Sequence, residues 1–170
     1  DPNTTYYFRA GALYNGTTIY TNAVPEFRQT LPQPLTGLDI PAVFQSSVTV
    51  AWMPLPGSPQ SATAVSYLLE ASTGPAFSSP ALFSSNTADI ALDRLTITGL
   101  QPDTNYYFRA GTLNQEGSVN YTATPATSTL ANQPVQQAFA LTAQTLTLTW
   151  LANSNPPDTR YLVEMADNAA

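Results

Sequence analysis

The sequence predicts an all-β protein built from repeated modules, and three observations support this prediction. The hexapeptide Tyr-Tyr-Phe-Arg-Ala-Gly occurs at residues 6–11 and again at residues 106–111 of the 170-residue chain. Residues 48–52 alternate apolar with small or polar side chains, the period-two pattern of a strand buried on one face. Fifteen prolines are spread along the chain, and no window carries apolar residues at helical spacing.

The repeat sets the size of one module. Thr30-Leu31 recurs as Thr129-Leu130, 129 − 30 = 99 positions later, and Trp52 recurs as Trp150, 150 − 52 = 98 positions later. One module therefore contains roughly 95 to 100 residues, a common domain size.

Aligned on this repeat, the chain divides into three parts. Residues 1–33 supply the last strands of a first module, residues 34–130 form a complete second module, and residues 131–170 begin a third. Both ends fall inside a module, so we expect a window from a longer repetitive polypeptide; the alternative is that the open ends of neighbouring chains complete one another. The connectors 31–35 and 130–134 are short and contain proline, which predicts a semi-rigid line of modules.

Four strands of the second module follow from alternation, and turn residues separate them. Tyr161, Val163 and Met165 repeat the second of these strands in the third module. The inward-facing positions are Val48, Val50 and Trp52; Tyr67, Leu69 and Ala71; Leu95, Ile97 and Leu100; and Tyr106, Phe108 and Ala110. Residues 72–94 show a less regular pattern.

The segment from Gly99 to Arg109 carries a family resemblance. It reads Gly-Leu-x-Pro-x-Thr-x-Tyr-x-Phe-Arg, and together with a Trp ending an early strand and a Tyr opening the next it resembles fibronectin type III repeats. The resemblance implies tandem immunoglobulin-like β-sandwiches, with Tyr106 forming a tyrosine corner whose hydroxyl bonds to upstream backbone. The Thr- and Asn-rich modules without lysine are closer to bacterial or archaeal surface and secreted repeat proteins than to animal matrix proteins.

Large aromatic and aliphatic residues at inward strand positions should form the structural core, because aromatic side chains bury large areas. These core residues are Trp52, Tyr67, Leu100, Tyr106, Phe108, Trp150, Tyr161, Tyr6 and Phe8.

Composition excludes several function classes. The chain has no Cys, His or Lys, so we expect no catalytic base or nucleophile of the usual kinds, no disulfide, no structural zinc and no cofactor. The formal charge of −6 disfavours nucleic acid and anionic lipid, and no stretch approaches twenty apolar residues, so the segment should not insert into a membrane. Asp89, Asp93 and Asp103 match no calcium-loop spacing, and we expect no metal site.

One polar pair follows from the repeat. Glu70 and Glu164 occupy the same repeat position, as do Arg9 and Arg109. Neighbouring strands of a sandwich should join Glu70 to Arg109 across one outer face, with Tyr107 beside them, as a solvated surface ion pair.

Two further groups are candidate sites. Asn3, Asn15 and Asn120 fit the Asn-x-Ser/Thr pattern near turns and are candidate glycosylation sites. Phe77, Leu82 and Phe83 either belong to a core strand interrupted by Pro80 or form an exposed edge that makes lateral contact with another chain.

The sequence therefore favours a non-catalytic structural segment of a large extracellular or cell-surface protein, such as a stalk, an adhesin shaft or a filament scaffold. Its expected partners are neighbouring modules and copies of itself. The alternative is a recognition module that binds a protein or polysaccharide through loops such as residues 113–119, or the spacer of a secreted glycan-degrading enzyme.

Overall fold

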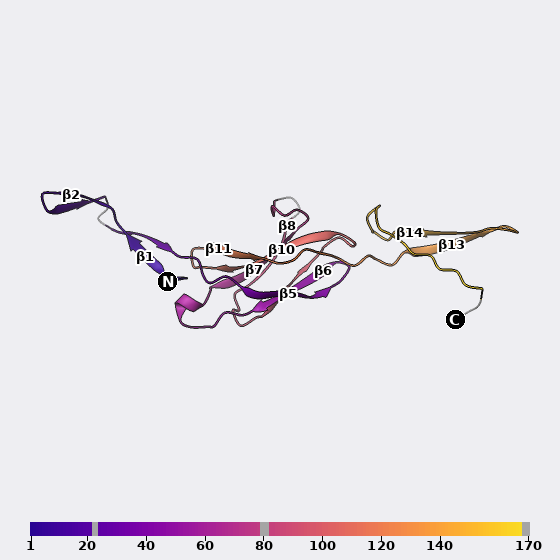
Figure 1. Cartoon of the computed structure of the whole chain (residues 1–170), viewed down its shortest axis with the longest axis horizontal. Helices are drawn as coiled ribbons and strands as arrows, with labels where there is room; N and C mark the ends of the chain where they lie inside the picture. Colours follow the sequence, from indigo (N-terminus) through magenta and orange to yellow (C-terminus); the bar gives the residue numbers. More distant parts are fainter. Residues whose placement is uncertain (22–23, 79–81, 168–170) are drawn as a thin grey trace.

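The centre of the molecule is a sandwich of two antiparallel sheets, seen in a computed structural model that describes residues 1–21, 24–78 and 82–167 (Figure 1). One sheet has the order β5-β6-β9, and the other has the order β11-β10-β7-β8, with β12 paired to the start of β10. The first sheet contains β5 (Thr36–Val43), β6 (Ser47–Met53) and β9 (Arg94–Thr98). The second contains β7 (Ser66–Ser72), β8 (Leu82–Thr87), β10 (Asn105–Leu113), β11 (Val119–Ala123) and β12 (Thr127–Ser128). A short 3-10 turn, η1 (Gln60–Ala62), lies in the loop between β6 and β7. The predicted all-β sandwich class is confirmed.

The inward positions of these strands meet between the sheets and are buried. The buried apolar residues are Leu35, Val48, Val50, Trp52, Ala64, Tyr67, Leu69, Ala71, Ile97, Leu100, Tyr106, Phe108 and Ala110, with Leu95 partly buried against them. The rings of Trp52 and Tyr67 meet edge to face, with their centres 5.3 Å apart. Alternation along the strands therefore locates the core, because successive side chains point to opposite faces of a sheet.

Two buried tyrosines anchor loops through their hydroxyl groups. Tyr106 accepts a hydrogen bond of 3.0 Å from the backbone N–H of Gln101, which is the tyrosine corner that the family resemblance implies. The Tyr67 hydroxyl accepts from the N–H of Leu55 at 2.8 Å and donates to the carbonyl of Ile90 at 2.9 Å. Each ring thus fills the core while its polar tip satisfies backbone groups.

An arm extends from each end of the sandwich (Figure 1). The N-terminal arm, residues 1–31, has two paired ladders: β1 (Thr5–Phe8) with β4 (Glu26–Gln29), and β2 (Gly11–Tyr14) with β3 (Thr17–Tyr20). The C-terminal arm, residues 131–167, has one hairpin of β13 (Val135–Leu141) and β14 (Leu146–Leu151).

The arms differ from the core predicted for them. Tyr6 is 38% exposed and Phe8 57% exposed, while Trp150 and Tyr161 are half-buried. Their inner faces have no opposing sheet among the described residues, so alternation alone does not bury them.

The strand expected around residues 161–165 is also absent from the structure, where residues 152–167 have no strand assignment. Its counterpart β7 lies between β10 and β8 and bonds to both. The C-terminal arm offers no such neighbours among its described residues, and a strand needs a hydrogen-bonding partner.

Candidate interaction surfaces

The outer face of the larger sheet carries a compact charged and aromatic cluster. Arg109 on β10 lies opposite Glu70 on β7, and its Nε donates to Glu70 Oε2 at 2.6 Å. The guanidinium carbon lies 3.9 Å from the ring centre of Tyr121 and 4.3 Å from that of Phe77. The predicted pair is confirmed, but the expectation that it is solvated is wrong, because Glu70 is only 8% exposed.

Tyr121 adds a titrating group to this cluster. Burial raises the pKa of the Tyr121 hydroxyl above its ordinary value, and the neighbouring Glu70 carboxylate raises it further. The cluster therefore favours a neutral Tyr121 beside the Arg109–Glu70 pair.

The repeated Arg-Ala-Gly sequence builds the same local arrangement in the N-terminal arm. The Arg9 guanidinium carbon lies 3.8 Å from the ring centre of Tyr20. A Cβ on Gly11 would lie 2.5 Å from Thr18 Cγ2, and one on Gly111 would lie 2.4 Å from Val119 Cγ1. Glycine two residues after the arginine is thus required by the close approach of the paired strand.

The three residues proposed for lateral contact do not form one surface. Phe83 points inward and packs edge to face on Tyr106, with ring centres 5.9 Å apart. Phe77 covers the Arg109 guanidinium, and Leu82 is 39% exposed. Pro80, on which the alternative interpretation depended, lies outside the described residues. Only Leu82 is classed as exposed, so a shared docking patch is not supported.

A cluster of side-chain amides joins the N-terminal arm to the sandwich, and sequence reasoning missed it. Asn3 and Asn114 are each 2% exposed, and Gln29 is 8% exposed. Asn3 Nδ2 donates to the carbonyls of Gln60 at 3.2 Å and Thr63 at 3.1 Å. We call this set of residues the amide joint, because it connects elements from both sides of the boundary.

The remaining bonds of the amide joint involve Gln29 and Asn114. Gln29 Nε2 donates to Asn3 Oδ1 at 3.0 Å, and Gln29 Oε1 accepts from the N–H of Gln115 at 2.7 Å. Asn114 Nδ2 donates to the carbonyl of Gln29 at 3.2 Å and to that of Thr30 at 3.3 Å. Such buried and mutually bonded polar groups fix relative orientation more strongly than a bare linker does.

The connector itself is bonded to β10 and β11 of the larger sheet. Thr112 Oγ1 donates to the carbonyl of Gln33 at 2.9 Å. Asn120 Nδ2 donates to the carbonyl of Pro32 at 2.8 Å, and Thr122 Oγ1 to that of Leu35 at 3.1 Å. The second connector is bonded within the C-terminal arm, where Asn155 accepts from the N–H of Asn132 at 2.7 Å and donates back to its carbonyl at 2.8 Å.

These contacts show that the three candidate glycosylation sites differ in accessibility. Asn3 is buried with both side-chain amide bonds in place, so an enzyme cannot reach it in the folded chain. Asn120 is half-buried, and its amide is engaged with Pro32. Asn15 is exposed in the turn between β2 and β3, and it stays a prediction.

The aspartates considered for calcium have local roles. Asp93 forms two hydrogen bonds of 2.8 Å with Arg94, and this pairing lowers the pKa of Asp93 below its ordinary value. Asp89 Oδ1 accepts from the N–H of Ala91. Within residues 1–21, 24–78 and 82–167 no group of three acidic side chains is placed to hold a metal ion. In those same ranges no helix is long and apolar enough to cross a membrane.

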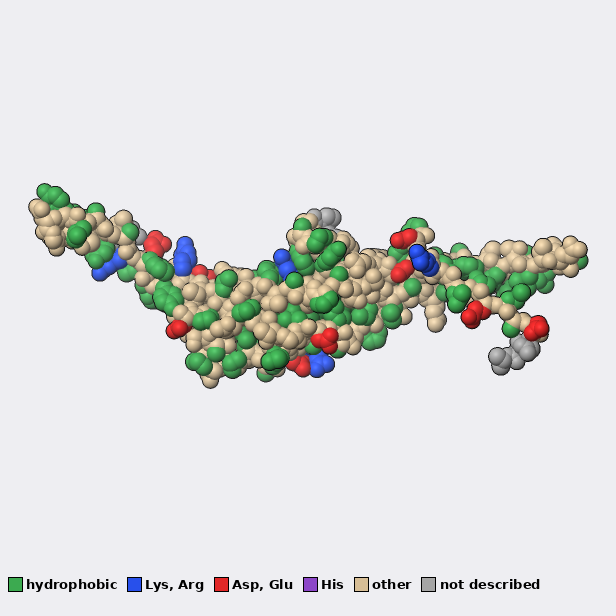
Figure 2. Space-filling view, in the orientation of Figure 1, with side chains coloured by type: hydrophobic (Ala, Val, Ile, Leu, Met, Phe, Trp, Pro, Cys, Tyr) green, Lys and Arg blue, Asp and Glu red, His purple; other side chains and the backbone are tan. Residues whose placement is uncertain are grey.

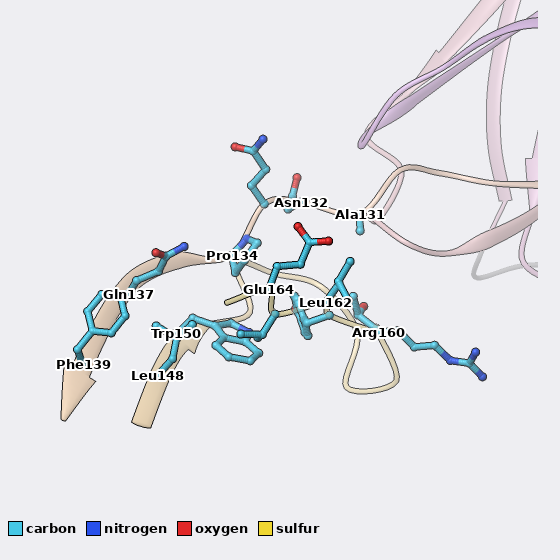
Figure 3. Close-up of a pocket in the computed structure, with 14 residues that line it drawn as sticks. Ala131, Asn132, Pro134, Gln137, Phe139, Leu148, Trp150, Arg160, Leu162 and Glu164 are labelled. Carbon is cyan, nitrogen blue, oxygen red and sulfur yellow. The ribbon is translucent and has the colours of Figure 1, made fainter. Parts of the chain in front are cut away.

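Both arms expose apolar faces, which Figure 2 shows as hydrophobic side chains toward the two tips of the molecule. In the C-terminal arm, Phe139, Leu148 and Trp150 line an open groove together with residues 160–164 (Figure 3). The Trp150 and Tyr161 rings meet edge to face with centres 5.4 Å apart, which repeats the Trp52–Tyr67 contact of the sandwich. This groove corresponds to the core of the central sandwich with one side open.

Several solved structures of fibronectin type III domains align with this chain. The FN1–FN3 domains of chicken CNTN1 align with a TM-score of 0.50 and 14% identity, over 76% of this chain and 44% of that chain. The FN5 domain of Drosophila Lar aligns with a TM-score of 0.48 and 20% identity, over 60% of this chain and 100% of that chain. The fn3 domain of the human collagen alpha-1(XX) chain aligns with a TM-score of 0.47 and 19% identity, over 62% and 91% of the two chains.

No curated protein matches the chain. The sequence model of the fibronectin type III domain matches residues 32–129, more than half of the chain. The protein therefore belongs to the fibronectin type III family.

Proposed function

We propose that this chain is a non-catalytic structural segment of an extracellular or cell-surface protein, serving as a stalk, an adhesin shaft or a filament scaffold. Fibronectin type III domains typically occur in extracellular or cell-surface proteins as structural or binding modules, and are generally non-catalytic. In this proposal residues 1–33 and 131–170 are partial modules of a tandem array around the complete module 34–130, and a bacterial or archaeal surface protein is the proposed source.

The amide joint is the observation that carries the proposal. A shaft must hold its modules in line, whereas recognition through the loops of one module does not require a fixed neighbour. Here Asn3, Gln29 and Asn114 are buried and bonded across the boundary, and the connector is bonded along β10 and β11. A joint of this kind resists bending, because a small change of angle would separate the bonded groups while they are still buried and leave them without partners.

The same contacts weigh against the recognition alternative. The loop between β10 and β11, the loop proposed for ligand binding, uses Asn114 and Gln115 to hold the N-terminal arm. Its most buried polar group is therefore already occupied within the chain.

Small-angle X-ray scattering and negative-stain imaging of the chain test the proposal. We expect elongated particles with one narrow distribution of angle between the N-terminal arm and the sandwich. A broad distribution, as for beads on a flexible string, would contradict the shaft. Saturable binding of a soluble oligosaccharide by such flexible monomers would support the recognition alternative instead.

A further inference from the structure

We infer that the chain bends at Ala131, between the sandwich and the C-terminal arm, whereas the amide joint holds the N-terminal arm and the sandwich as one rigid body. The boundary after the sandwich, which we call the second boundary, is then a hinge. This property goes beyond the proposed shaft, whose stiffness depends on the first boundary alone. Figure 1 shows the extended segment that links the sandwich to β13.

The turns that lead to the two boundaries have the same backbone. Asn3 and Asp103 occupy the same repeat position, and both have left-handed backbone, with φ values of 47° and 45°. The N–H of Asn3 donates to the carbonyl of Leu31 at 3.0 Å, and the N–H of Asp103 donates to that of Leu130 at 3.2 Å. Both turns therefore bring the same side-chain position to the end of their module.

The side chains at these equivalent positions differ, and the donors of the amide joint are missing at the second boundary. Asn3 Nδ2 donates to loop carbonyls of the following module, but the carboxylate of Asp103 has no N–H to donate. Gln29 Nε2 donates to Asn3, whereas the counterpart of Gln29, 128 − 29 = 99 positions later, is the exposed and shorter Ser128. Both replacements lie within the complete module, so they hold whatever completes the third module.

The loop that receives the bonds of Asn3 is also shorter after the second boundary. The carbonyls of Gln60 and Thr63 accept these bonds, and both lie in the loop between residues 52 and 67, which are 67 − 52 = 15 positions apart. The corresponding residues 150 and 161 are 161 − 150 = 11 positions apart, four fewer. The second boundary therefore lacks the acceptor segment as well as the donors.

The chain is bonded on both sides of Ala131, which leaves this residue as the pivot. On the sandwich side, the N–H of Leu130 donates to the carbonyl of Phe44 at 3.1 Å. On the other side, Asn132 exchanges two bonds of 2.7 and 2.8 Å with the side chain of Asn155. Ala131 is exposed, and in the described part of the chain its backbone makes no hydrogen bond. A hinge needs only a few such residues, because their torsion angles absorb the rotation between two rigid bodies.

The first connector offers no comparable freedom. Pro32, Gln33 and Leu35 each accept a side-chain bond from β10 or β11, in addition to the bonds of the amide joint. Across the second boundary, by contrast, no hydrogen bond or ion pair within residues 1–21, 24–78 and 82–167 joins the sandwich to residues after 131. The chain thus consists of a locked pair of modules followed by a swivel.

Distance measurements between spin labels test the hinge in the whole chain. The sequence contains no cysteine, so pairs of introduced cysteines can be labelled selectively. Thr98→Cys with Thr147→Cys spans the second boundary, and Arg28→Cys with Thr98→Cys spans the first; all three residues are exposed and lie in strands. By double electron–electron resonance, we expect the Thr98–Thr147 distance distribution to be at least about twofold broader than the Arg28–Thr98 distribution.

Substitutions at the pivot locate the motion. Ala131→Pro fixes one torsion angle and restricts the preceding residue, so it should narrow the Thr98–Thr147 distribution. Ala131→Gly adds backbone freedom and should broaden it. Gln33→Gly is the matched control at an exposed position of the first connector, and it should leave the Arg28–Thr98 distribution unchanged because the carbonyl bonds and the amide joint remain.

Two outcomes would overturn the hinge. One is a Thr98–Thr147 distribution in the unmodified chain that is no wider than the rotamers of the labels require. The other is a broad distribution that responds to neither Ala131→Pro nor Ala131→Gly, which would place the motion within the C-terminal arm. A broad Arg28–Thr98 distribution would instead contradict the shaft, and the hinge would still be judged by the response to substitution of Ala131.

Discussion

Arg109 shows how the few charged residues of this chain are used. The chain has five arginines and no other basic side chain, and Arg109 and Arg9 each lie on an aromatic ring of the paired strand. Glu70 accepts its bond from Arg109 while almost fully shielded from solvent. The pair therefore stabilises one arrangement of β7 and β10, which a fully solvated surface pair would not do.

Replacing Arg109 with Ala should lower the free energy of unfolding by about 1 to 3 kcal/mol, because it leaves the shielded Glu70 carboxylate without its partner. Urea denaturation measures the loss. Arg94→Ala is the matched control, since the side chains of Arg94 and Asp93 are 57% and 48% exposed, and its unfolding midpoint should hardly move. Equal effects of the two substitutions would show that the outer-face cluster is ordinary surface.

Tyr121 gives the fold a dependence on alkaline pH. Its pKa is raised in the folded state, as is that of Tyr67, so folding favours the protonated hydroxyls. Their contribution is complete below the unfolded tyrosine pKa of about 10 and is lost as pH rises through the folded values. Denaturant titrations from pH 8 to 11 should show a constant unfolding free energy and then a decline, which Tyr121→Phe makes shallower. An unchanged decline in that variant would contradict the assignment.

Sequence reasoning found part of this cluster and could not find the rest. The Glu70–Arg109 pair follows from the repeat and from strand alternation, which depend only on local pattern. Phe77 completes the cluster from an irregular loop at a φ of 50°, and the tertiary fold alone decides where that loop goes. The burial of Glu70 likewise depends on residues outside β7 that pack against it, so the sequence of its own strand does not predict it.

At the scale of elements, the turn before β1 has a different role in the structure from the one that its sequence suggests. Asn3-Thr4-Thr5 reads as an acceptor pattern for glycosylation, yet Asn3 is a buried residue of the amide joint. The sequence contains no signal for the joint, because its bonds span separations of up to 86 positions, as between Gln29 and Gln115. Four strands of the sandwich, β6, β7, β9 and β10, could in contrast be placed from alternation within a few residues.

Asn3→Ala should loosen the joint, and Asn15→Ala is its matched control. Both residues lie in the N-terminal arm with left-handed backbone, at φ values of 47° and 46°, so both substitutions carry the same backbone strain. Only Asn3→Ala removes the bonds to Gln60 and Thr63, and it takes from the Thr63 carbonyl its donor, whereas the Gln60 carbonyl still accepts from the N–H of Thr63 at 3.3 Å. We expect hydrogen exchange in β1 and β4 to accelerate roughly tenfold or more in Asn3→Ala, which corresponds to a loss of about 1.4 kcal/mol or more in the free energy of local opening. Exchange should change little in Asn15→Ala. Equal exchange in the two variants would show that the joint adds no rigidity.

For the whole molecule, the sandwich and the arms differ in how much core they hold. Among the described residues, thirteen apolar side chains are buried between the sheets of the sandwich, whereas Phe8 is 57% exposed and Phe139 62% exposed in the arms. Alternation predicted the inward positions of the sandwich correctly. It could not predict the burial of the corresponding positions in the arms, because burial needs a second layer and the described residues of each arm form only one.

Native-state hydrogen exchange should map this difference at low protein concentration. Amides of β6, β7 and β10 should exchange only through global unfolding, while those of β2, β3, β13 and β14 should exchange faster by several orders of magnitude. Mass spectrometry of peptides from each strand measures the contrast. Comparable protection of β14 and β6 in a dilute monomer would contradict a core confined to the sandwich.

The bonds that tie residues 32–35 to the side of β10 and β11 also bear on mechanical load. Tension applied along the molecule would enter the sandwich through Thr112, Asn120 and Thr122, whose side chains hold three successive points of the connector. Pulling would have to release these contacts before the first residues of β5 felt the force directly. Under load, residues 32–35 would thus detach from β10 and β11 first, and the chain would lengthen slightly while the hydrophobic core stayed intact.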